Sequence, residues 1–154
     1  MDIILPLISV SSLSMREQRA VLLSALYALD SLDYDVSAGS VFNGFFNDFA
    51  IQTESADAVF KEAESIIVQR NDLDEQIKPL LDNWRFDRLS VCTKLILRMG
   101  LWELVNTQTS PTVIINEAVE LAKGFAETDA YKFVNGILDE WTKRNKKQDE
   151  EEHV

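Results

Sequence analysis

Apolar residues recur along much of this chain at the spacing of helices that bury one face. Residues 115, 118, 119 and 122 follow the i, i+3, i+4, i+7 pattern, and so do residues 134, 137, 138 and 141. Seven segments are predicted to be helical: residues 14–30, 41–49, 55–70, 72–84, 89–105, 111–124 and 128–144. The 154-residue chain holds only five Gly and three Pro, so few breakers interrupt these segments. The pattern therefore predicts an all-α protein.

The ends and faces of these segments support the prediction. Ser14 and Asp72 are each followed three positions later by Glu, which is the capping-box pattern of a helix N-terminus. Pro79 lies inside the helix that Asp72 would open, and it should bend that helix because it lacks a backbone donor. Four Phe residues give the segment 41–49 an apolar face, which indicates core packing. The segment 89–105 is apolar almost all round and is typical of a central bundle helix.

The charge of the chain limits how it can bind nucleic acid. Its formal net charge is −11, from 15 Lys and Arg against 26 Asp and Glu. Such a chain repels phosphate backbones at long range. RNA binding would therefore need a local basic patch or a basic partner.

Residues that indicate catalysis are missing from the sequence. One Cys and one His are too few for an internal disulfide or a zinc site. Cys92 lies in an apolar helical run and His153 in a charged tail, so Cys92 is interpreted as a small buried hydrophobe. The sequence has no Gly-rich phosphate loop and no nucleophile elbow. We therefore expect neither an enzyme nor a cofactor or metal.

Three parts are predicted along the chain: an N-terminal extension over residues 1–14, a helical domain over 15–144, and a disordered charged tail over 145–154. The extension has Asp2 where a signal peptide would be basic, so it is expected to pack on the domain or stay loose. No stretch reaches the roughly 18 apolar residues that span a membrane. These features predict a cytoplasmic protein.

Three phrases contain residues that helical packing does not explain. They are Leu97–Leu104 (LRMGLWEL), Ile115–Lys123 (INEAVELAK) and Lys132–Asp139 (KFVNGILD). Asn116, Asn135 and Gly136 are poor helix formers within them. Together the phrases resemble the NusB family of bacterial transcription antitermination factors, over roughly residues 16–144. Because the resemblance begins there, Met15 is expected to be an alternative start.

This resemblance implies a seven-helix protein made of two small bundles. NusB proteins bind the boxA element of nascent ribosomal RNA transcripts, and they do so best as a heterodimer with NusE, a small-subunit ribosomal protein. The pair joins an antitermination complex on RNA polymerase with NusA and NusG. We therefore expect boxA RNA, NusE and this complex as partners.

The resemblance also assigns candidate RNA-binding residues. They are Arg16, Arg19, Tyr27, Phe125, Asp129, Lys132 and Phe133. Only Arg16 and Arg19 match the family's arginine-rich first-helix segment, which predicts weak RNA binding by the chain alone. Lys132 can neutralise a phosphate. Phe133 fits either base stacking or core packing, and Tyr27 fits either an RNA contact or a core position.

The partner surface is expected on the middle helices, between residues 82 and 94. Its candidate residues are Asp82, Arg88 and Lys94. The family often has an acidic residue near Thr93, which this chain lacks.

Structural roles are expected for several other polar or small residues in the three phrases. The side chains of Asn116 and Asn135 are expected to bond neighbouring backbone at helix ends, and Gly136 to allow close helix approach. Arg98 and Glu103 are expected to be buried, with each paired either to the other or to another helix.

Two functional hypotheses follow. The first is an antitermination factor that binds boxA RNA jointly with NusE, and the three intact phrases favour it. The second is a divergent NusB-fold protein-interaction module or homodimer with little RNA affinity of its own, and the sparse N-terminal arginines favour it.

Overall fold

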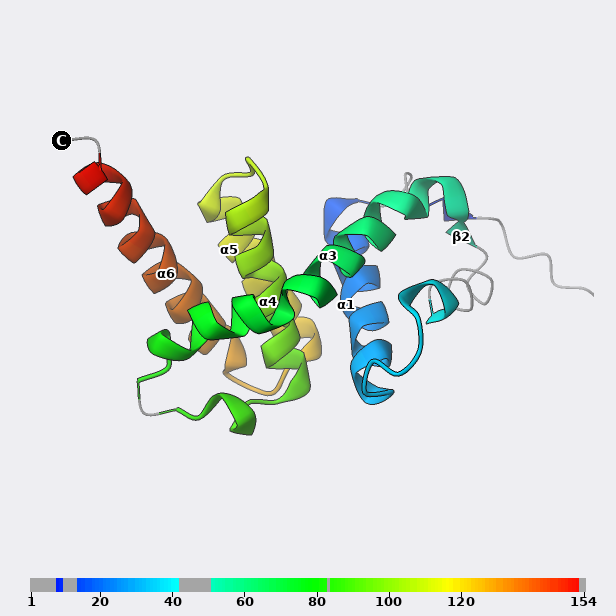
Figure 1. Cartoon of the computed structure of the whole chain (residues 1–154), viewed down its shortest axis with the longest axis horizontal. Coiled ribbons are helices and arrows are strands. Elements are labelled where there is room, and N and C mark those ends of the chain that lie inside the picture. Colours follow the sequence, from blue (N-terminus) through cyan, green and yellow to red (C-terminus); the bar gives the residue numbers. More distant parts are fainter. Residues whose placement is uncertain (1–7, 10–13, 42–50, 83, 153–154) are drawn as a thin grey trace, which may run out of the picture. The chain divides into compact units, whose positions relative to one another are not determined.

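The computed structural model describes residues 8–9, 14–41, 51–82 and 84–152 of the chain. The chain divides into two compact units, which are Met1–Val68 and Gln69–Val154. Helices make up most of the described residues in both units (Figure 1). The prediction of an all-α protein is confirmed, with one two-residue strand pair added to it. No helix in the described ranges is long and apolar enough to cross a membrane.

The first helix of the first unit is α1, Met15–Ser31, and its N-terminus is capped as predicted. The Ser14 hydroxyl accepts a hydrogen bond from the Glu17 backbone N–H at 3.1 Å, and the Glu17 carboxylate accepts one from the Ser14 N–H at 3.2 Å. The inward face of α1 is apolar and buried; it consists of Leu22, Leu23, Ala25, Leu26 and Leu29. The periodic spacing of these residues therefore produces the core of this unit.

Two further segments of the first unit bear on the predictions. Strand β1, Ile8–Ser9, pairs in parallel with strand β2, Ile51–Gln52, so at these two residues the N-terminal extension is joined to the fold. Residues 38–41 are helical, which places the start of the second helix before residue 41. The remainder of the predicted four-Phe helix, residues 42–49, lies outside the described residues.

Helix α3, Thr53–Ile77, corrects the two separate helices predicted over 55–70 and 72–84. Asp72 lies inside α3, so the capping box predicted there is wrong. Asp is only a mildly unfavourable residue in a helix interior, and a single one does not end a helix. One long helix, α3, therefore takes the place of two of the seven expected helices. The last helix of the described residues is α6.

Pro79 ends α3 rather than bending it. The chain tightens into the 3₁₀ helix η2, Lys78–Leu80, immediately after Ile77. Proline lacks a backbone donor and its ring clashes with the carbonyl four residues earlier, so an α-helix does not continue easily past it. A second 3₁₀ helix, η3, spans Phe86–Arg88 and leads to α4.

The second unit packs three helices together: α4, Val91–Asn106; α5, Pro111–Phe125; and α6, Ala130–Glu152. Helix α4 is buried on several sides, as its all-round apolar sequence predicts; its buried apolar residues include Leu95, Ile96, Leu97, Met99 and Leu101. The Arg98 guanidinium donates two hydrogen bonds, of 2.7 and 2.8 Å, to the buried Asp74 carboxylate. Arg98 therefore pairs with another helix, and Glu103 is buried as expected.

Close helix approach occurs at Gly100, not at Gly136. A Cβ atom on Gly100 would lie 2.7 Å from Cδ1 of Leu138, so a side chain at this position would require the Leu138 side chain to shift. A Cβ on Gly136 would meet nothing within 4 Å. Asn116 and Asn135 are exposed and lie within helices rather than at their ends. The packing and capping roles predicted for these three residues are therefore wrong.

Helix α6 continues through Glu152, whereas a disordered tail was expected beyond Arg144. Two ion pairs at i, i+4 spacing bridge successive turns here, Asp139–Lys143 at 3.0 Å and Glu140–Arg144 at 2.9 Å. Such pairs favour continuation of a helix. Both pairs lie just before the predicted tail, and α6 continues from them without a break through residues 145–152.

Candidate nucleic-acid interface

The predicted RNA-binding residues are divided between the two units. Arg16, Arg19 and Tyr27 belong to α1 in the first unit. The other four, Phe125, Asp129, Lys132 and Phe133, surround the turn between α5 and α6 in the second unit.

On α1, the three predicted residues differ in exposure. Arg16 is exposed, while Arg19 is only 9% exposed. Tyr27 is 48% exposed, so it is not a core residue. Arg16 and Tyr27 are about three helical turns apart and share one face, since 3.6 residues complete a turn. This face offers one exposed cation and one exposed aromatic ring to a ligand.

The turn between α5 and α6 has a defined backbone geometry. Helix α5 ends at Phe125, which is 51% exposed. Asp129 adopts the left-handed conformation with φ 68°, immediately before α6 begins at Ala130. Its carboxylate lies 3.6 Å from the Lys132 ammonium, and both side chains are about two-thirds exposed. Lys132 is therefore accessible to a phosphate, but a carboxylate neutralises part of its charge.

Phe133 is half-buried, and its ring contacts Trp84. The two ring centroids are 5.8 Å apart in an edge-to-face arrangement. Trp84 itself is 64% exposed, which is unusual for so large an apolar side chain. Phe133 thus packs on a neighbouring ring and remains partly accessible, so base stacking by Phe133 stays a prediction.

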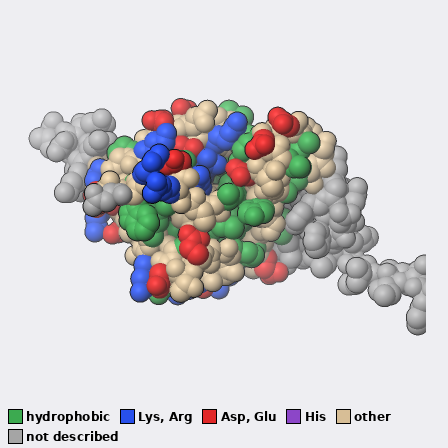
Figure 2. All heavy atoms as spheres, turned by 90° about the horizontal axis from the view of Figure 1, so that it is seen from below, with side chains coloured by type: hydrophobic (Ala, Val, Ile, Leu, Met, Phe, Trp, Pro, Cys, Tyr) green, Lys and Arg blue, Asp and Glu red, His purple; other side chains and the backbone are tan. Residues whose placement is uncertain are grey.

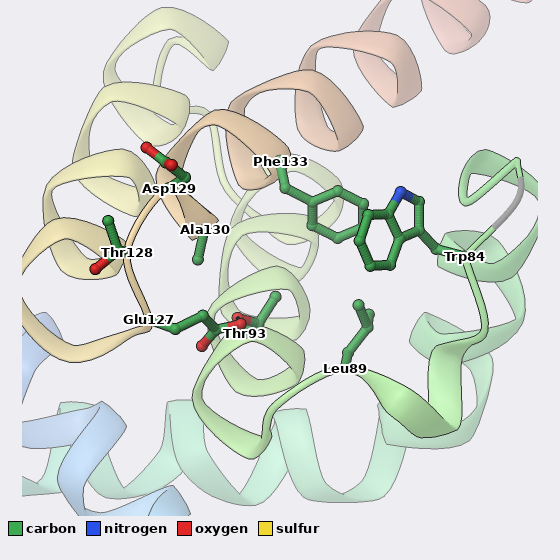
Figure 3. A pocket seen from close by; sticks show the side chains of 8 residues that line it. All are labelled: Trp84, Leu89, Thr93, Glu127, Thr128, Asp129, Ala130 and Phe133. Carbon is green, nitrogen blue, oxygen red and sulfur yellow. Dashed lines mark hydrogen bonds between the residues drawn. The ribbon is translucent and has the colours of Figure 1, made fainter.

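A pocket of about 250 Å³ opens beside this pair of rings (Figure 3). Its lining is formed by Trp84, Leu89, Thr93, Glu127, Thr128, Asp129, Ala130 and Phe133. Two of the predicted RNA-binding residues, Asp129 and Phe133, are therefore brought together in one hollow.

Glu127 is a residue of this site that the sequence did not indicate. Its carboxylate accepts hydrogen bonds from the hydroxyls of Ser90 at 2.7 Å and Thr93 at 3.1 Å. The Ser90 hydrogen bond holds the pKa of the Glu127 carboxyl below its usual range. Thr93 on α4 thus contacts a carboxylate that comes from the turn between α5 and α6.

Cys92, which precedes Thr93, is only partly exposed. Burial, assisted by the negative charge of Glu127, raises the pKa of the Cys92 thiol. A raised pKa disfavours the reactive thiolate. Cys92 is nevertheless only half-buried, not fully buried as predicted.

The predicted partner-binding residues lie in the second unit. Asp82 is exposed with φ 48°, Arg88 is exposed at the end of η3, and Lys94 is half-buried on α4. The Lys94 ammonium lies 5.3 Å from the centre of the Phe86 ring, and the cations of Lys78 and Arg98 lie 5.8 and 5.9 Å from it. Lys and Arg side chains gather on one face of the molecule, with acidic and hydrophobic side chains beside them (Figure 2).

A groove of about 480 Å³ connects the two sets of predicted residues in the second unit. It is lined by Leu80, Leu81, Asp82, Trp84, Lys132, Phe133, Gly136, Ile137, Glu140 and Arg144. Asp82 from the predicted partner surface and Lys132 and Phe133 from the predicted RNA surface share it. The bare backbone of Gly136 contributes to its wall, which gives this glycine a place in the site rather than in the core.

Comparison with known proteins decides the family. The model of the NusB family matches residues 16–143, which is most of the chain. The chain belongs to the NusB family. The resemblance read from the three sequence phrases is thereby confirmed, and so is the expectation of a non-enzymatic protein. No group of three His, Cys, Asp or Glu side chains in the described ranges could hold a metal ion.

Individual NusB proteins are similar to this chain over nearly their whole length. The transcription antitermination protein NusB of Staphylococcus carnosus is 36% identical over 126 residues, covering 82% of this chain and 97% of that protein. The structure of T. maritima NusB superposes with a TM-score of 0.76 at 26% identity, covering 85% of this chain and 92% of that one. A crystal structure of antitermination factors NusB and NusE in complex with double-stranded RNA has a TM-score of 0.72 at 24% identity, covering 84% and 96%. That likeness shows the fold alone.

Proposed function

We propose that this protein is a transcription antitermination factor that binds the boxA RNA of ribosomal RNA transcripts together with NusE. The curated relatives are transcription antitermination proteins, and a solved neighbour of the same fold is a complex with NusE and RNA. The structural observation that carries the proposal is the edge formed by Asp129, Lys132 and Phe133 beside the exposed Trp84. It offers an exposed cation for a phosphate, beside exposed aromatic surface.

A basic partner explains how so acidic a chain can bind RNA. The net charge is −11, and Arg16 and Lys132 are the exposed cations among the predicted RNA-binding residues. Each phosphate contact contributes about 0.7 to the slope of log affinity against log salt concentration for a single strand. Two contacts therefore give weak binding with a shallow salt dependence. NusE would supply further cations, and the charge of this chain would speed its encounter with NusE.

The wider assembly follows from the same proposal. The pair would act in the cytoplasm, within an antitermination complex on RNA polymerase with NusA and NusG. The surface for NusE includes Asp82, Arg88 and Lys94 near η3 and the start of α4.

A second candidate is a protein-interaction module or homodimer that has lost RNA affinity. The burial of Arg19 favours it, because a buried guanidinium is poorly placed to meet a phosphate. The first proposal is preferred because the turn between α5 and α6 keeps both its cation and its aromatic ring accessible.

Competition between a boxA RNA and an RNA of the same length with a scrambled sequence tests the proposal. The protein together with NusE should prefer boxA, and Arg16→Ala and Lys132→Ala should each weaken binding. Equal affinity for both RNAs, with NusE present and folded, would favour the interaction module instead.

A further inference from the structure

Glu127 is an ionised carboxylate held in place without a cation. Two hydroxyls, those of Ser90 and Thr93, donate hydrogen bonds to its two oxygens. Within the ranges that the structure describes, no Lys, Arg or His side chain forms an ion pair with it. A carboxylate has about four lone-pair positions, so the two hydroxyls and the backbone N–H of Glu127 itself leave acceptor capacity unused. The group is thus oriented in advance for a further donor.

The surroundings of Glu127 define the kind of donor that fits. The pocket beside it is walled by Trp84, Leu89, Ala130 and Phe133, so most of its lining is apolar. Figure 3 shows Glu127 and Thr93 on one side of the pocket and the Trp84 ring on the other. A ligand that fills the pocket therefore meets apolar and aromatic surface along its length and a negative charge at one end.

An arginine or lysine side chain has this combination of properties. Its methylene stem packs on apolar surface, while its charged head remains available for a partner. A guanidinium also stacks on the face of a tryptophan and bonds a carboxylate with two parallel hydrogen bonds.

An RNA base is a poorer fit to this pocket. The charged residues in the lining are Glu127 and Asp129, and both are acidic. They would repel the phosphate attached to a base that entered the pocket. A protein cation, in contrast, is attracted both by this pocket and by a chain of net charge −11.

We propose that the pocket formed by Trp84, Phe133 and Glu127 receives an arginine or lysine side chain of the basic protein partner. This inference rests on the proposed function, in which that partner is NusE. It separates two surfaces at the turn between α5 and α6: Lys132 faces RNA, while Glu127 faces the partner protein.

The test compares two substitutions that remove the same charge at different places. Glu127→Gln keeps the shape of the side chain but removes the negative charge. Its amide oxygen can accept from one of the two hydroxyls, and its NH2 group can donate to the other once that hydroxyl rotates. Glu120→Gln is the matched control, on the exposed surface of α5 outside the pocket. The binding of each full-length variant to purified NusE is measured by isothermal titration calorimetry at two salt concentrations.

The expected result is a loss of NusE affinity of about ten-fold or more for Glu127→Gln, since a charge-assisted hydrogen bond is removed. The salt dependence should also become weaker, and Glu120→Gln should change neither. Trp84→Ala provides a second variant, because this side chain is largely exposed and its removal leaves the core intact. It should also weaken NusE binding, and thermal unfolding followed by circular dichroism verifies that each variant is folded.

Each other outcome has its own meaning. Equal NusE affinity for Glu127→Gln and Glu120→Gln, with joint boxA binding retained, would overturn the inference and leave the proposed function standing. A change in RNA affinity of the protein alone, with unchanged NusE affinity, would assign the pocket to a base instead and also overturn the inference. If the unaltered protein does not bind NusE at all, the proposed function fails and the inference fails with it.

Discussion

Replacing Asp129 with Asn should increase the affinity of the protein for boxA RNA. The Asp129 carboxylate lies 3.6 Å from the Lys132 ammonium and is the negative charge closest to the cation expected to meet a phosphate. Asparagine suits this position because Asp129 has φ 68°, and Asn is enriched in the left-handed region. The substitution therefore removes the charge and keeps the backbone of the turn.

The size of the effect follows from the geometry of the pair. Two unit charges about 4 Å apart attract each other by about 1 kcal/mol in water. Both side chains are about two-thirds exposed, so solvent and salt reduce this value further. The gain in RNA affinity should thus be at most about five-fold, and it should be largest at low salt.

Fluorescence anisotropy of a labelled boxA RNA, with NusE present, measures this change. Asp139→Asn is the control, because it removes the same charge from an ion pair elsewhere on α6, with Lys143 at 3.0 Å. This control corrects for the gain in RNA affinity that the loss of any one negative charge would give. An affinity that falls for Asp129→Asn, relative to this control, would refute the reasoning and show that the Asp129 carboxylate accepts a hydrogen bond from the RNA.

Three further predictions concern the same unit. Lys132→Gln should weaken boxA binding and lower the salt slope by about 0.7, because one phosphate contact is lost; titrations at several salt concentrations measure it. Gly100→Ala should destabilise the fold by about 1–3 kcal/mol in urea unfolding, since its methyl group would lie 2.7 Å from Leu138 Cδ1; unchanged stability would contradict the close packing. Asp74→Asn should cost about 3–5 kcal/mol, because it leaves the buried Arg98 without its counter-charge; the same unfolding assay tests it.

The positions of the buried faces could be predicted from the sequence alone. The periodic leucines of α1 and the almost entirely apolar run of α4 face inward, because the burial of apolar surface dominates the choice of face. The Ser14 capping box was also predictable, since all of its hydrogen bonds join residues within one turn. Local patterns of this kind determine most of the fold.

Helix boundaries and packing partners were harder to predict. A capping pattern at Asp72 does not start a helix when the preceding residues are already helical, and α3 therefore continues through it. The choice between Gly100 and Gly136 depends on which glycine faces another helix, and only the tertiary structure shows that Leu138 lies against Gly100. Both errors came from residues whose role depends on their neighbours in space.

The candidate site illustrates the same limit. The family resemblance indicated Asp129, Lys132 and Phe133, which indeed lie together at one turn. Glu127 carried no signal of its own, because its contacts with Ser90 and Thr93 join residues far apart in the chain. The exposed Trp84 was likewise missed, since hydrophobic spacing cannot distinguish a ring on the surface from one in the core.

The central claim is that this chain binds boxA RNA jointly with NusE, and one titration tests it most directly. Labelled boxA RNA is titrated with the full-length protein alone, with NusE alone, and with an equimolar mixture of the two, at low and at physiological salt. The account predicts weak binding by each protein alone, tight binding by the mixture, and a steeper salt dependence for the mixture than for this chain alone. Binding by the mixture that is no tighter than binding by the better of the two single proteins would contradict it.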